Sequence, residues 1–317
     1  MNSILVTGVA GFIGSHLTEK LLELGFKVVG IDNFDPFYDK SLKQKNLEGF
    51  VNNSNFTLIE GDICDERTWE KINTPIEAVI HLAAKAGVLP SLNDPKSYIR
   101  TNILGTQFVL EYMKEKQIKK MLFASSSSVY GNNPTIPFVE TDNVDHPISP
   151  YAYTKKAGEL MIHTWHYLYQ IDAICLRFFT VYGPRQRPDL AIRKFTQKIL
   201  AREPIEMYGD GSTARDYTFV NDTVDGIIKA LQYILEHNQV YEIVNLGNHH
   251  PVTLRDLIDK IYKQLDLPSQ IQVKGKQAGD VDITYAEISK AKKMFGYMPH
   301  TSIDEGLKEF VKWFKNN

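Results

Sequence analysis

The beginning of the chain limits its fold most strongly, because a glycine-rich turn there joins one apolar run to an amphipathic stretch and a second apolar run. Residues 4–7 and 28–31 are predicted strands, and the stretch between the turn and residue 24 has helical spacing. Glycines in such a turn let the backbone approach a pyrophosphate that sits on the helix N-terminus. The turn carries Gly8, Gly11, Phe12, Ile13 and Gly14.

Asp32 follows the second of these strands, where a carboxylate can accept hydrogen bonds from a ribose hydroxyl. The same carboxylate disfavours a ribose 2′-phosphate, so the sequence predicts NAD in preference to NADP. A plain tight turn is the alternative interpretation of the glycines, and Asp32 weighs against it.

The alternation of strands and helices continues as far as residue 178. Predicted strands at 56–60, 78–82, 121–125 and 173–178 are separated by helical stretches such as 98–116 and 153–169. This order predicts the α/β class, with a Rossmann-type, doubly wound parallel sheet. Ligands of such sheets bind at the carboxyl ends of the strands, so residues that follow different strands should converge on one crevice. These residues are Gly8, Asp32, Ala83, Ser126 and Phe179.

After residue 179 the pattern changes to short segments rich in turn residues, such as 183–184 and 209–212. We therefore expect an NAD-binding domain over residues 1–178 and a smaller α/β substrate domain over residues 179–317. The helical stretch 224–235 and the strand 242–246 are expected to return to the large sheet, so that residues 217–246 interleave the two domains.

The composition indicates a soluble enzyme. The net charge of −2 offers no broad basic surface for nucleic acid, and no apolar run is long enough to span a membrane. Cys64 and Cys175 are too few for a metal site, and none of the histidines has metal-ligand spacing. We expect a cytoplasmic protein with neither a nucleic-acid nor a membrane partner.

A serine cluster at residues 125–128 and a Tyr-x-x-x-Lys pair at Tyr151 and Lys155 form the main catalytic candidate. Residues four apart leave a helix on the same face, so the ammonium can act on the phenol. Ser149 fits the N-cap and Pro150 the first helical position, which places Tyr151 in the first turn, at the positive end of the helix dipole.

A phenol titrates near pH ~10, so acting as a base near neutrality requires its pKa to fall by roughly 3 units. One neighbouring cation supplies about 1 to 3 units, which makes Lys155 alone marginal. A second positive group is therefore needed, such as the helix terminus or an oxidised nicotinamide ring. The catalytic pair and the glycine turn thus point to the same cofactor.

Taken in order, the motifs resemble those of the extended short-chain dehydrogenase/reductases, and among these the NAD-dependent nucleotide-sugar 4-epimerases, most of all those acting on UDP-glucuronate. The resemblance covers nearly the whole chain. Besides the glycine turn, Asp32, the serine cluster and the Tyr/Lys pair, it rests on Gly61-Asp62-Ile63, His81-Leu82-Ala83-Ala84, Asn102, Arg177-Phe178-Phe179 and Arg215-Asp216-Tyr217.

The resemblance implies that hydride passes from C4 of the sugar to NAD, that the 4-keto sugar rotates, and that the hydride returns to its opposite face. Tyr151 would take the proton of the 4-hydroxyl, Lys155 would hold the nicotinamide ribose, and Ser126 would hydrogen-bond the reacting oxygen. The residues expected to contact NAD are Gly8, Gly11, Phe12, Ile13, Gly14, Asp32, Asn33, Asp62, Ile63, Leu82, Ala83, Ala84, Lys85, Asn102, Ser125, Tyr151, Lys155 and Phe178. Those expected to contact the UDP-sugar are Ser126, Ser127, Ser128, Tyr151, Phe179, Thr180, Arg185, Arg187, Tyr208, Arg215, Gln277 and Asp280.

Departures around this core favour an acidic sugar. Dehydratase relatives carry Asp-Glu after the catalytic Ser or Thr, whereas this chain has Ser127 and Ser128, which disfavours dehydration. Hydroxyls there and at Thr180 can donate charge-assisted hydrogen bonds to a C6 carboxylate. Arg185 and Arg187 add guanidinium groups suited to a carboxylate or phosphate. We therefore expect conversion of UDP-glucuronate to UDP-galacturonate.

Several alternatives stay open. Glucuronate epimerases usually carry Arg after Ala-Gly-Val, but Leu89 stands there, so one cation is missing. Ser127 and Ser128 fit a polar loop, Arg215 a solvated side chain, Tyr208 a core residue and Asp280 a turn. The enzyme could then act on UDP-glucose or a UDP-N-acetylhexosamine, or be a dehydrogenase or reductase, or an NAD-sensing protein without activity. Residues 165–169 favour packing in the core or in a homodimer, which the resemblance also implies.

Overall fold

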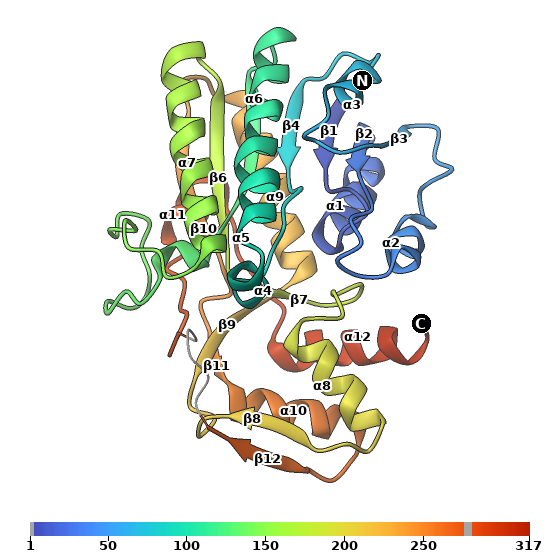
Figure 1. Cartoon of the computed structure of the whole chain (residues 1–317), viewed down its shortest axis with the longest axis vertical. Helices are drawn as coiled ribbons and strands as arrows, with labels where there is room; N and C mark the ends of the chain where they lie inside the picture. Colours follow the sequence, from blue (N-terminus) through green and yellow to red (C-terminus); the bar gives the residue numbers. More distant parts are fainter. Residues whose placement is uncertain (1–2, 276–280) are drawn as a thin grey trace.

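The computed structural model describes residues 3–275 and 281–317 of the chain. Its main element is a seven-stranded sheet in which all paired strands run parallel (Figure 1), and this confirms the predicted doubly wound, Rossmann-type α/β fold. The strands in their order across the sheet are β10 (Tyr241–Leu246), β6 (Asp172–Phe178), β5 (Lys120–Ser126), β4 (Ala78–His81), β1 (Ser3–Thr7), β2 (Lys27–Asp32) and β3 (Phe56–Glu60). The order reverses between β1 and β4, where a crevice forms at the carboxyl ends of the strands.

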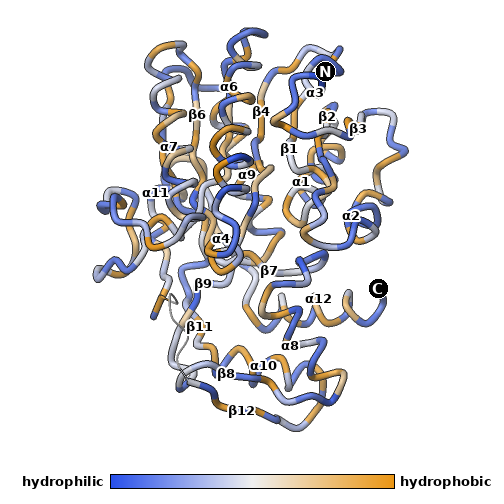
Figure 2. The backbone as a smooth tube through the Cα atoms, viewed as in Figure 1, coloured by the Kyte–Doolittle hydropathy of each residue, from blue (hydrophilic) through white to orange (hydrophobic). Residues whose placement is uncertain are grey.

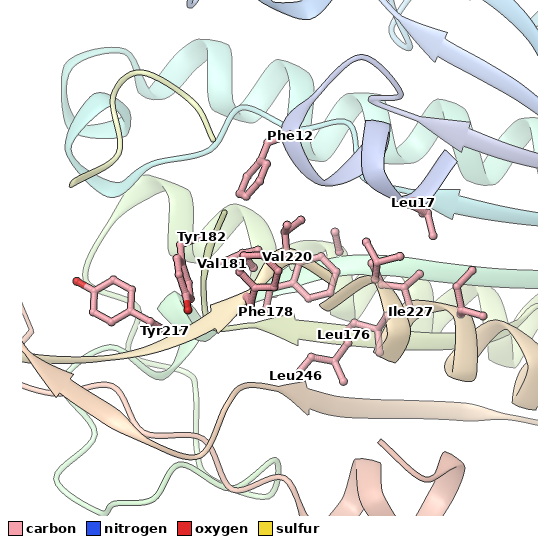
Figure 3. Packing of buried hydrophobic residues seen from close by; sticks show 14 of the residues in the cluster. Phe12, Leu17, Leu176, Phe178, Val181, Tyr182, Tyr217, Val220, Ile227 and Leu246 are labelled. Carbon is pink, nitrogen blue, oxygen red and sulfur yellow. The ribbon is translucent and has the colours of Figure 1, made fainter. Parts of the chain in front are cut away.

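Helices cover both faces of the sheet. On one face α1 (Phe12–Glu23) and α9 (Val220–Glu236) pack against each other and share an apolar cluster with the sheet. Figure 3 shows Phe12 and Leu17 of α1 pointing toward side chains of α9 and β6. On the other face α3 (Glu66–Glu70), α6 (Gly105–Glu115) and α7 (Pro150–Tyr169) bury a second cluster. The inner strands β1, β4 and β6 are buried along their whole length because both faces of the sheet are covered there.

The smaller part of the chain lies below the carboxyl ends of the large sheet in the view of Figure 1. It holds a three-stranded sheet ordered β11 (Pro251–Thr253), β9 (Ala214–Phe219), β7 (Thr180–Tyr182), and a parallel pair of β8 (Ile205–Tyr208) with β12 (Ile271–Lys274). Its helices are α8 (Ala191–Leu200), α10 (Leu254–Leu265) and α12 (Ile303–Lys315). Since α10 packs on α8 and α12, it buries one face, and hydrophobic and hydrophilic residues alternate along it in Figure 2.

The chain passes more than once between the two parts. In the sequence, α9 and then β10 come after β9 of the smaller part. In space, β10 pairs with β6 at the edge of the large sheet. Helix α11 (Ser289–Phe295) also packs on α9 and β10. We therefore keep a division at residue 178, with residues 217–246 returning to the first part, as a proposal, and we add α11 to that first part.

The helical stretch expected at 98–116 is divided into three segments. These are α5 (Pro95–Tyr98), a π-helical segment η1 (Ile99–Leu104) and α6. Asn102 lies in η1, and its side chain hydrogen-bonds both the backbone N–H and the carbonyl of Lys85, at 2.8 and 3.0 Å. A local widening of this kind often marks a functional site, because it places a side chain where an ordinary helical turn does not.

Helix α7 begins as the sequence predicts. The hydroxyl of Ser149 accepts a hydrogen bond from the backbone N–H of Ala152 at 3.1 Å, and Pro150 occupies the first turn. The helix therefore starts three residues earlier than the predicted stretch 153–169, and its first turn carries Tyr151.

Two short helices complete the surroundings of the crevice, namely α4 (Val88–Asn93) and the 3-10 turn η2 (Ser127–Tyr130), while α2 (Lys40–Leu47) follows β2.

Candidate active site

A cavity of about 570 Å³ lies at the carboxyl ends of the large sheet and extends toward the smaller part. Most of the residues expected to contact NAD or the UDP-sugar line this cavity, although they come from distant parts of the chain. They are Gly8, Gly11, Phe12, Ile13, Gly14, Asp32, Asn33, Ile63, Leu82, Ala83, Ala84, Lys85, Ser125, Ser126, Ser127, Ser128, Tyr151, Lys155, Phe178, Phe179, Thr180, Arg187 and Arg215.

The glycine turn between β1 and α1 has the shape that a pyrophosphate needs. Gly8 has φ +77°, and a Cβ there would lie 2.9 Å from the backbone nitrogen of Ala83. A Cβ on Gly14 would collide with the carbonyl of Gly8. Only glycine therefore fits at these positions, and the backbone stays open to a ligand at the N-terminus of α1.

Asp32 is buried at the end of β2 and is held by backbone donors. Its carboxylate accepts hydrogen bonds from the N–H groups of Ala10 and Phe34, at 3.0 and 2.8 Å. The ammonium of Lys43 lies 3.8 Å away and is itself buried. Burial raises the pKa of Asp32, while Lys43 and the two N–H groups oppose the rise. An acid at this position fits a ribose with free hydroxyls.

Two of the expected NAD contacts, Asn102 and Asp62, are not among the residues that line the cavity. Asn102 holds the backbone of Lys85 and also donates to Thr154 Oγ1 at 3.0 Å, so it positions the segment that lines the cavity. Asp62 accepts hydrogen bonds from Cys64 N–H and from Arg100, at 2.8 and 2.9 Å. The contacts of Asn102 and Asp62 with NAD stay predictions.

The proton-transfer candidates meet where β5 ends and α7 begins. Ser126 is the last residue of β5, and its Oγ accepts a hydrogen bond from the hydroxyl of Ser128 at 3.0 Å. The ammonium of Lys155 lies 5.9 Å from the ring centroid of Tyr151 and donates to the carbonyl of Ala124 at 2.7 Å. The sequence spacing thus brings all three functional groups to one end of the cavity.

The side chains of the protein, without a cofactor, do not lower the pKa of the Tyr151 phenol, although a base at neutral pH requires a lower pKa. Burial raises the pKa of Tyr151, and only the hydroxyl of Ser126 and the charge of Arg187 oppose that rise. Burial also lowers the pKa of Lys155 to about 7, which weakens it as a fixed cation, although Glu159 acts in the opposite direction. Deprotonation of Tyr151 near neutral pH therefore needs a second positive group, which the oxidised nicotinamide ring of bound NAD would supply.

A buried ion pair lies behind the catalytic residues. The carboxylate of Glu159 on α7 accepts two hydrogen bonds from the guanidinium of Arg177 on β6, each at 2.9 Å, and both side chains are 1% exposed. Glu159 also accepts from the hydroxyl of Ser125 at 2.6 Å. One carboxylate thus joins α7, β5 and β6, the three elements that carry Tyr151, Ser126 and Phe178.

The two arginines of the 183–189 segment point in different directions. Arg187 lines the cavity, but Arg185 forms an ion pair with Glu19 of α1 at 2.8 Å and does not line it. The backbone of Arg185 has φ +62°, a left-handed conformation that separates the two side chains. The expectation that Arg185 contacts the sugar is therefore corrected, and its role is to anchor the segment to α1.

Tyr208 does not line the cavity either. It lies in β8, which pairs with β12 in the smaller part, and it is 43% exposed. Gln277 and Asp280 lie outside the described residues. Arg215 lines the cavity from β9, and its Nη1 donates to the carbonyl of Ala214 at 2.8 Å.

Arg187 brings a cation to the segment that Leu89 follows, where the sequence carries no arginine. Its Nη2 donates to the carbonyl of Ala86 at 3.1 Å, so the guanidinium lies directly beside the Ala-Gly-Val segment that Leu89 follows. Arg187 also pairs with both carboxylate oxygens of Asp189, at 2.9 and 2.6 Å, and lies 5.2 Å from the ring centroid of Phe37. A cation from a distant loop therefore reaches this side of the cavity.

Sequence reasoning missed several residues of the cavity wall. Tyr98 stacks edge-on against Tyr151 with ring centroids 6.2 Å apart, and its hydroxyl donates to Ala86 at 3.1 Å. Lys43, Phe37 and Tyr38 line the wall near Asp32. Lys43 lies in the polar helix α2, so only the fold reveals its burial, whereas the aromatic pair beside Asp32 was a visible signal.

Two histidines with lowered pKa values, the partly buried His16 and the buried His81, predict how the fold responds to acid. Burial lowers the pKa of His16 to about 4 and that of His81 to about 3, from 6.5. Between pH ~4 and ~6.5 the unfolded chain binds more protons than the folded chain, so the free energy of unfolding falls as the pH falls, by up to about 1.4 kcal/mol per pH unit for each histidine. Urea unfolding of the wild type and His16→Gln at pH 7, 6 and 5 measures this slope. In His16→Gln the free energy of unfolding should change less steeply with pH than in the wild type, by the contribution of one histidine. An unchanged slope would contradict the lowered pKa of His16.

Within the part of the chain that the structure describes, no group of three or more His, Cys, Asp or Glu side chains is arranged to hold a metal ion. No helix there is long and apolar enough to cross a membrane.

Comparison with known proteins identifies the family. The family model described as GDP-mannose 4,6 dehydratase matches residues 5–310. The chain is 42% identical to a UDP-glucuronate 4-epimerase of Thermodesulfobacterium geofontis, over 100% of this chain and 97% of that protein. A crystal structure of UDP-glucuronic acid 4-epimerase from Bacillus cereus, in complex with UDP-glucuronic acid and NAD, superposes with a TM-score of 0.93 at 36% identity, over 99% of both chains.

The UDP-glucose 4-epimerase of Thermotoga maritima, solved with UDP-glucose, superposes with a TM-score of 0.89 at 34% identity, over 99% of both chains. These comparisons confirm the fold and the NAD cofactor that the sequence resemblance implied. The chain belongs to the GDP-mannose 4,6-dehydratase family of extended short-chain dehydrogenase/reductases.

Proposed function

We propose that this enzyme is an isomerase that interconverts UDP-glucuronate and UDP-galacturonate by NAD-dependent 4-epimerisation. The observation that carries the proposal is the guanidinium of Arg187 beside Ala86, on the wall of the cavity that also holds Tyr151 and the serine hydroxyls. A charged carboxylate needs such donors when it leaves water. The similarity to a UDP-glucuronate 4-epimerase at 42% identity supports the same substrate.

The residues divide into a cofactor end and a sugar end. The glycine turn and Asp32 fit the pyrophosphate and the adenosine ribose, and the bound NAD supplies the acceptor and donor for hydride at C4. Tyr151 takes the proton of the 4-hydroxyl, Lys155 holds the nicotinamide ribose, and Ser126 hydrogen-bonds the reacting oxygen. Ser127, Ser128, Thr180 and Arg187 receive the C6 carboxylate. Arg215 lines the cavity from β9 and would bind the diphosphate.

The family name does not make this chain a dehydratase. Elimination of water requires an acid and a base beside the sugar, and the two positions after Ser126 are Ser127 and Ser128. Hydroxyl groups of unperturbed serines cannot exchange protons at neutral pH as a carboxyl pair does. A 4-epimerase acting on UDP-glucose is the second candidate, favoured by the bidentate pairing of Arg187 with Asp189, which offsets the positive charge at the sugar end.

Parallel assays with UDP-glucuronate, UDP-glucose and UDP-N-acetylglucosamine, followed by NMR, test the substrate. We expect UDP-glucuronate to be converted at the highest kcat/KM. The variant Arg187→Met should lose about 10- to 100-fold in kcat/KM for UDP-glucuronate, as expected for a charge-assisted hydrogen bond, and less for UDP-glucose. Conversion of UDP-glucose alone would contradict our reading of Ser127, Ser128, Thr180 and Arg187.

We also propose a cytoplasmic homodimer that forms through α7. Tyr167 and Leu168, at the end of α7, are 80% and 56% exposed, while Trp165 and Tyr169 pack against the core. Large apolar side chains on one exposed helix face support an interface between copies. Sedimentation of the wild type and Tyr167→Glu/Leu168→Glu tests this proposal.

A further inference from the structure

The segment from Gly183 to Asp189 connects the nucleotide-binding helix α1 with the sugar end of the cavity. Its two arginines lie two residues apart, yet Arg185 reaches α1 and Arg187 reaches the cavity. Gln186, between them, is 2% exposed, and its carbonyl accepts a hydrogen bond from Arg193. The segment is therefore packed along its length.

Two contacts hold the segment to α1. The guanidinium of Arg185 pairs with Glu19 at 2.8 Å, and Nε2 of His16 lies 3.0 Å from the carbonyl oxygen of Pro184. Because a carbonyl oxygen only accepts, His16 donates this bond. Burial lowers the pKa of His16 to about 4, so the ring stays neutral and keeps the bond at neutral pH. The backbone of Arg185 has a left-handed φ of +62°, directly after Pro184, so the strained residue is held by both contacts with α1.

At the other end, Arg187 is held at two of its three nitrogens. Nε donates to Asp189, and Nη2 donates to Asp189 and Ala86. Within residues 3–275 and 281–317, Nη1 donates no hydrogen bond, and Arg187 lines the cavity. The guanidinium is therefore oriented before a ligand arrives, with Nη1 left to donate to it. Preorganised donors bind more tightly because less side-chain freedom is lost on binding.

We propose that Arg185, with its partner Glu19, is a positioning residue that sets the affinity for the sugar carboxylate by orienting Arg187. The inference rests on the proposed function, in which Arg187 receives that carboxylate. Loss of the Arg185–Glu19 pair leaves only the His16–Pro184 contact between the segment and α1, so Arg187 presents Nη1 in a less fixed direction. The glycine turn at the start of α1 is untouched, so the binding of NAD stays as it is.

Titration calorimetry with the NAD-loaded enzyme tests this positioning role. For Arg185→Met, Kd for UDP-glucuronate should rise about tenfold, and for Arg187→Met about 100-fold. Since Arg185 acts only through Arg187, the double variant Arg185→Met/Arg187→Met should match Arg187→Met within about twofold. Affinity for UDP, which lacks the sugar carboxylate, should be unchanged in Arg185→Met. Glu19→Gln removes the charge but keeps an acceptor oxygen, so it should raise Kd in the same direction and by less than Arg185→Met, and it serves as the second variant if Arg185→Met does not fold.

A matched control lies on the same helix. Lys20 of α1 pairs with Glu23 at 2.9 Å, but these side chains are 49% and 64% exposed, and the pair includes no residue of the segment. Lys20→Met should leave Kd for UDP-glucuronate within twofold of the wild type. An unchanged Kd in Arg185→Met and Glu19→Gln, an equal loss for UDP, or losses that multiply in the double variant would each overturn the proposal.

The same experiment separates this proposal from the proposed function. If the wild type binds UDP-glucuronate but does not convert it, the proposed epimerase activity is contradicted and the positioning role of Arg185 is not. The comparison of Kd values between the wild type, the single variants and the double variant requires no turnover. A wild type that binds UDP-glucuronate no more tightly than UDP contradicts both.

Discussion

Replacing Tyr151 with phenylalanine is expected to lower kcat by about 10²- to 10⁴-fold, the usual contribution of a general acid or base. The phenyl ring keeps the edge-on contact with Tyr98 at 6.2 Å, so the wall of the cavity remains in place. Only the group that takes and returns the proton of the 4-hydroxyl is lost. The measurement is kcat for UDP-glucuronate, together with the NAD content and the melting temperature of the purified variant, both of which should match the wild type.

Tyr98→Phe is the matched control for this loss. It also removes one phenolic hydroxyl from the cavity wall, but that hydroxyl donates to the carbonyl of Ala86 and takes no part in the proton transfer. We expect a loss of less than about tenfold. If Tyr151→Phe kept more than a tenth of the activity, or lost no more than Tyr98→Phe, Tyr151 would not be the base.

The second large effect concerns the buried pair of Glu159 and Arg177. Glu159→Gln should lower the free energy of unfolding by about 3 to 5 kcal/mol, because it leaves the guanidinium of Arg177 buried without a counter-charge. Both side chains are 1% exposed, so water cannot replace the lost partner. The measurement is urea unfolding followed by circular dichroism. Activity should fall as well, since the pair joins α7 to the strands that carry Ser126 and Phe178.

A double variant shows whether the effect comes from the unpaired charge. Glu159→Gln/Arg177→Met removes both charges and should be more stable than Glu159→Gln alone, since replacing a whole buried pair costs far less than breaking it. An exposed pair provides the scale: Arg255→Met, which removes the Arg255–Asp259 pair on α10, should change stability by less than about 1 kcal/mol. A Glu159→Gln variant as stable as Arg255→Met would contradict the assignment.

The strands of the large sheet could be predicted because each is a short, continuous apolar run. The predicted strand 173–178 corresponds to β6 (Asp172–Phe178). The predicted strand 242–246 corresponds to β10 (Tyr241–Leu246), at the edge of the sheet. The serine cluster and the Tyr/Lys pair could also be placed, since both depend on local geometry. Ser149 and Pro150 fix the start of α7, and Lys155 lies four positions after Tyr151 on that helix.

Residues whose environment depends on distant contacts could not be placed in this way. The sequence of the 183–189 segment offers two arginines with no sign of which one reaches the cavity, and the answer depends on Glu19 and on a left-handed backbone at Arg185. Asn102 lies close to Lys85 only because η1 widens the helix, which an even helical pattern over 98–116 did not reveal. In each case the deciding partner is far away in the sequence.

The most direct test of the account is the conversion of UDP-[4-²H]glucuronate in ordinary water, without added NAD. If hydride leaves C4 and returns to its opposite face within one active site, UDP-galacturonate should carry the deuterium at C4, with no deuterium in the solvent and no net change in nicotinamide absorbance. Loss of the label to water, or NADH formed in step with the substrate consumed, would contradict an epimerase that restores its own NAD in every turnover.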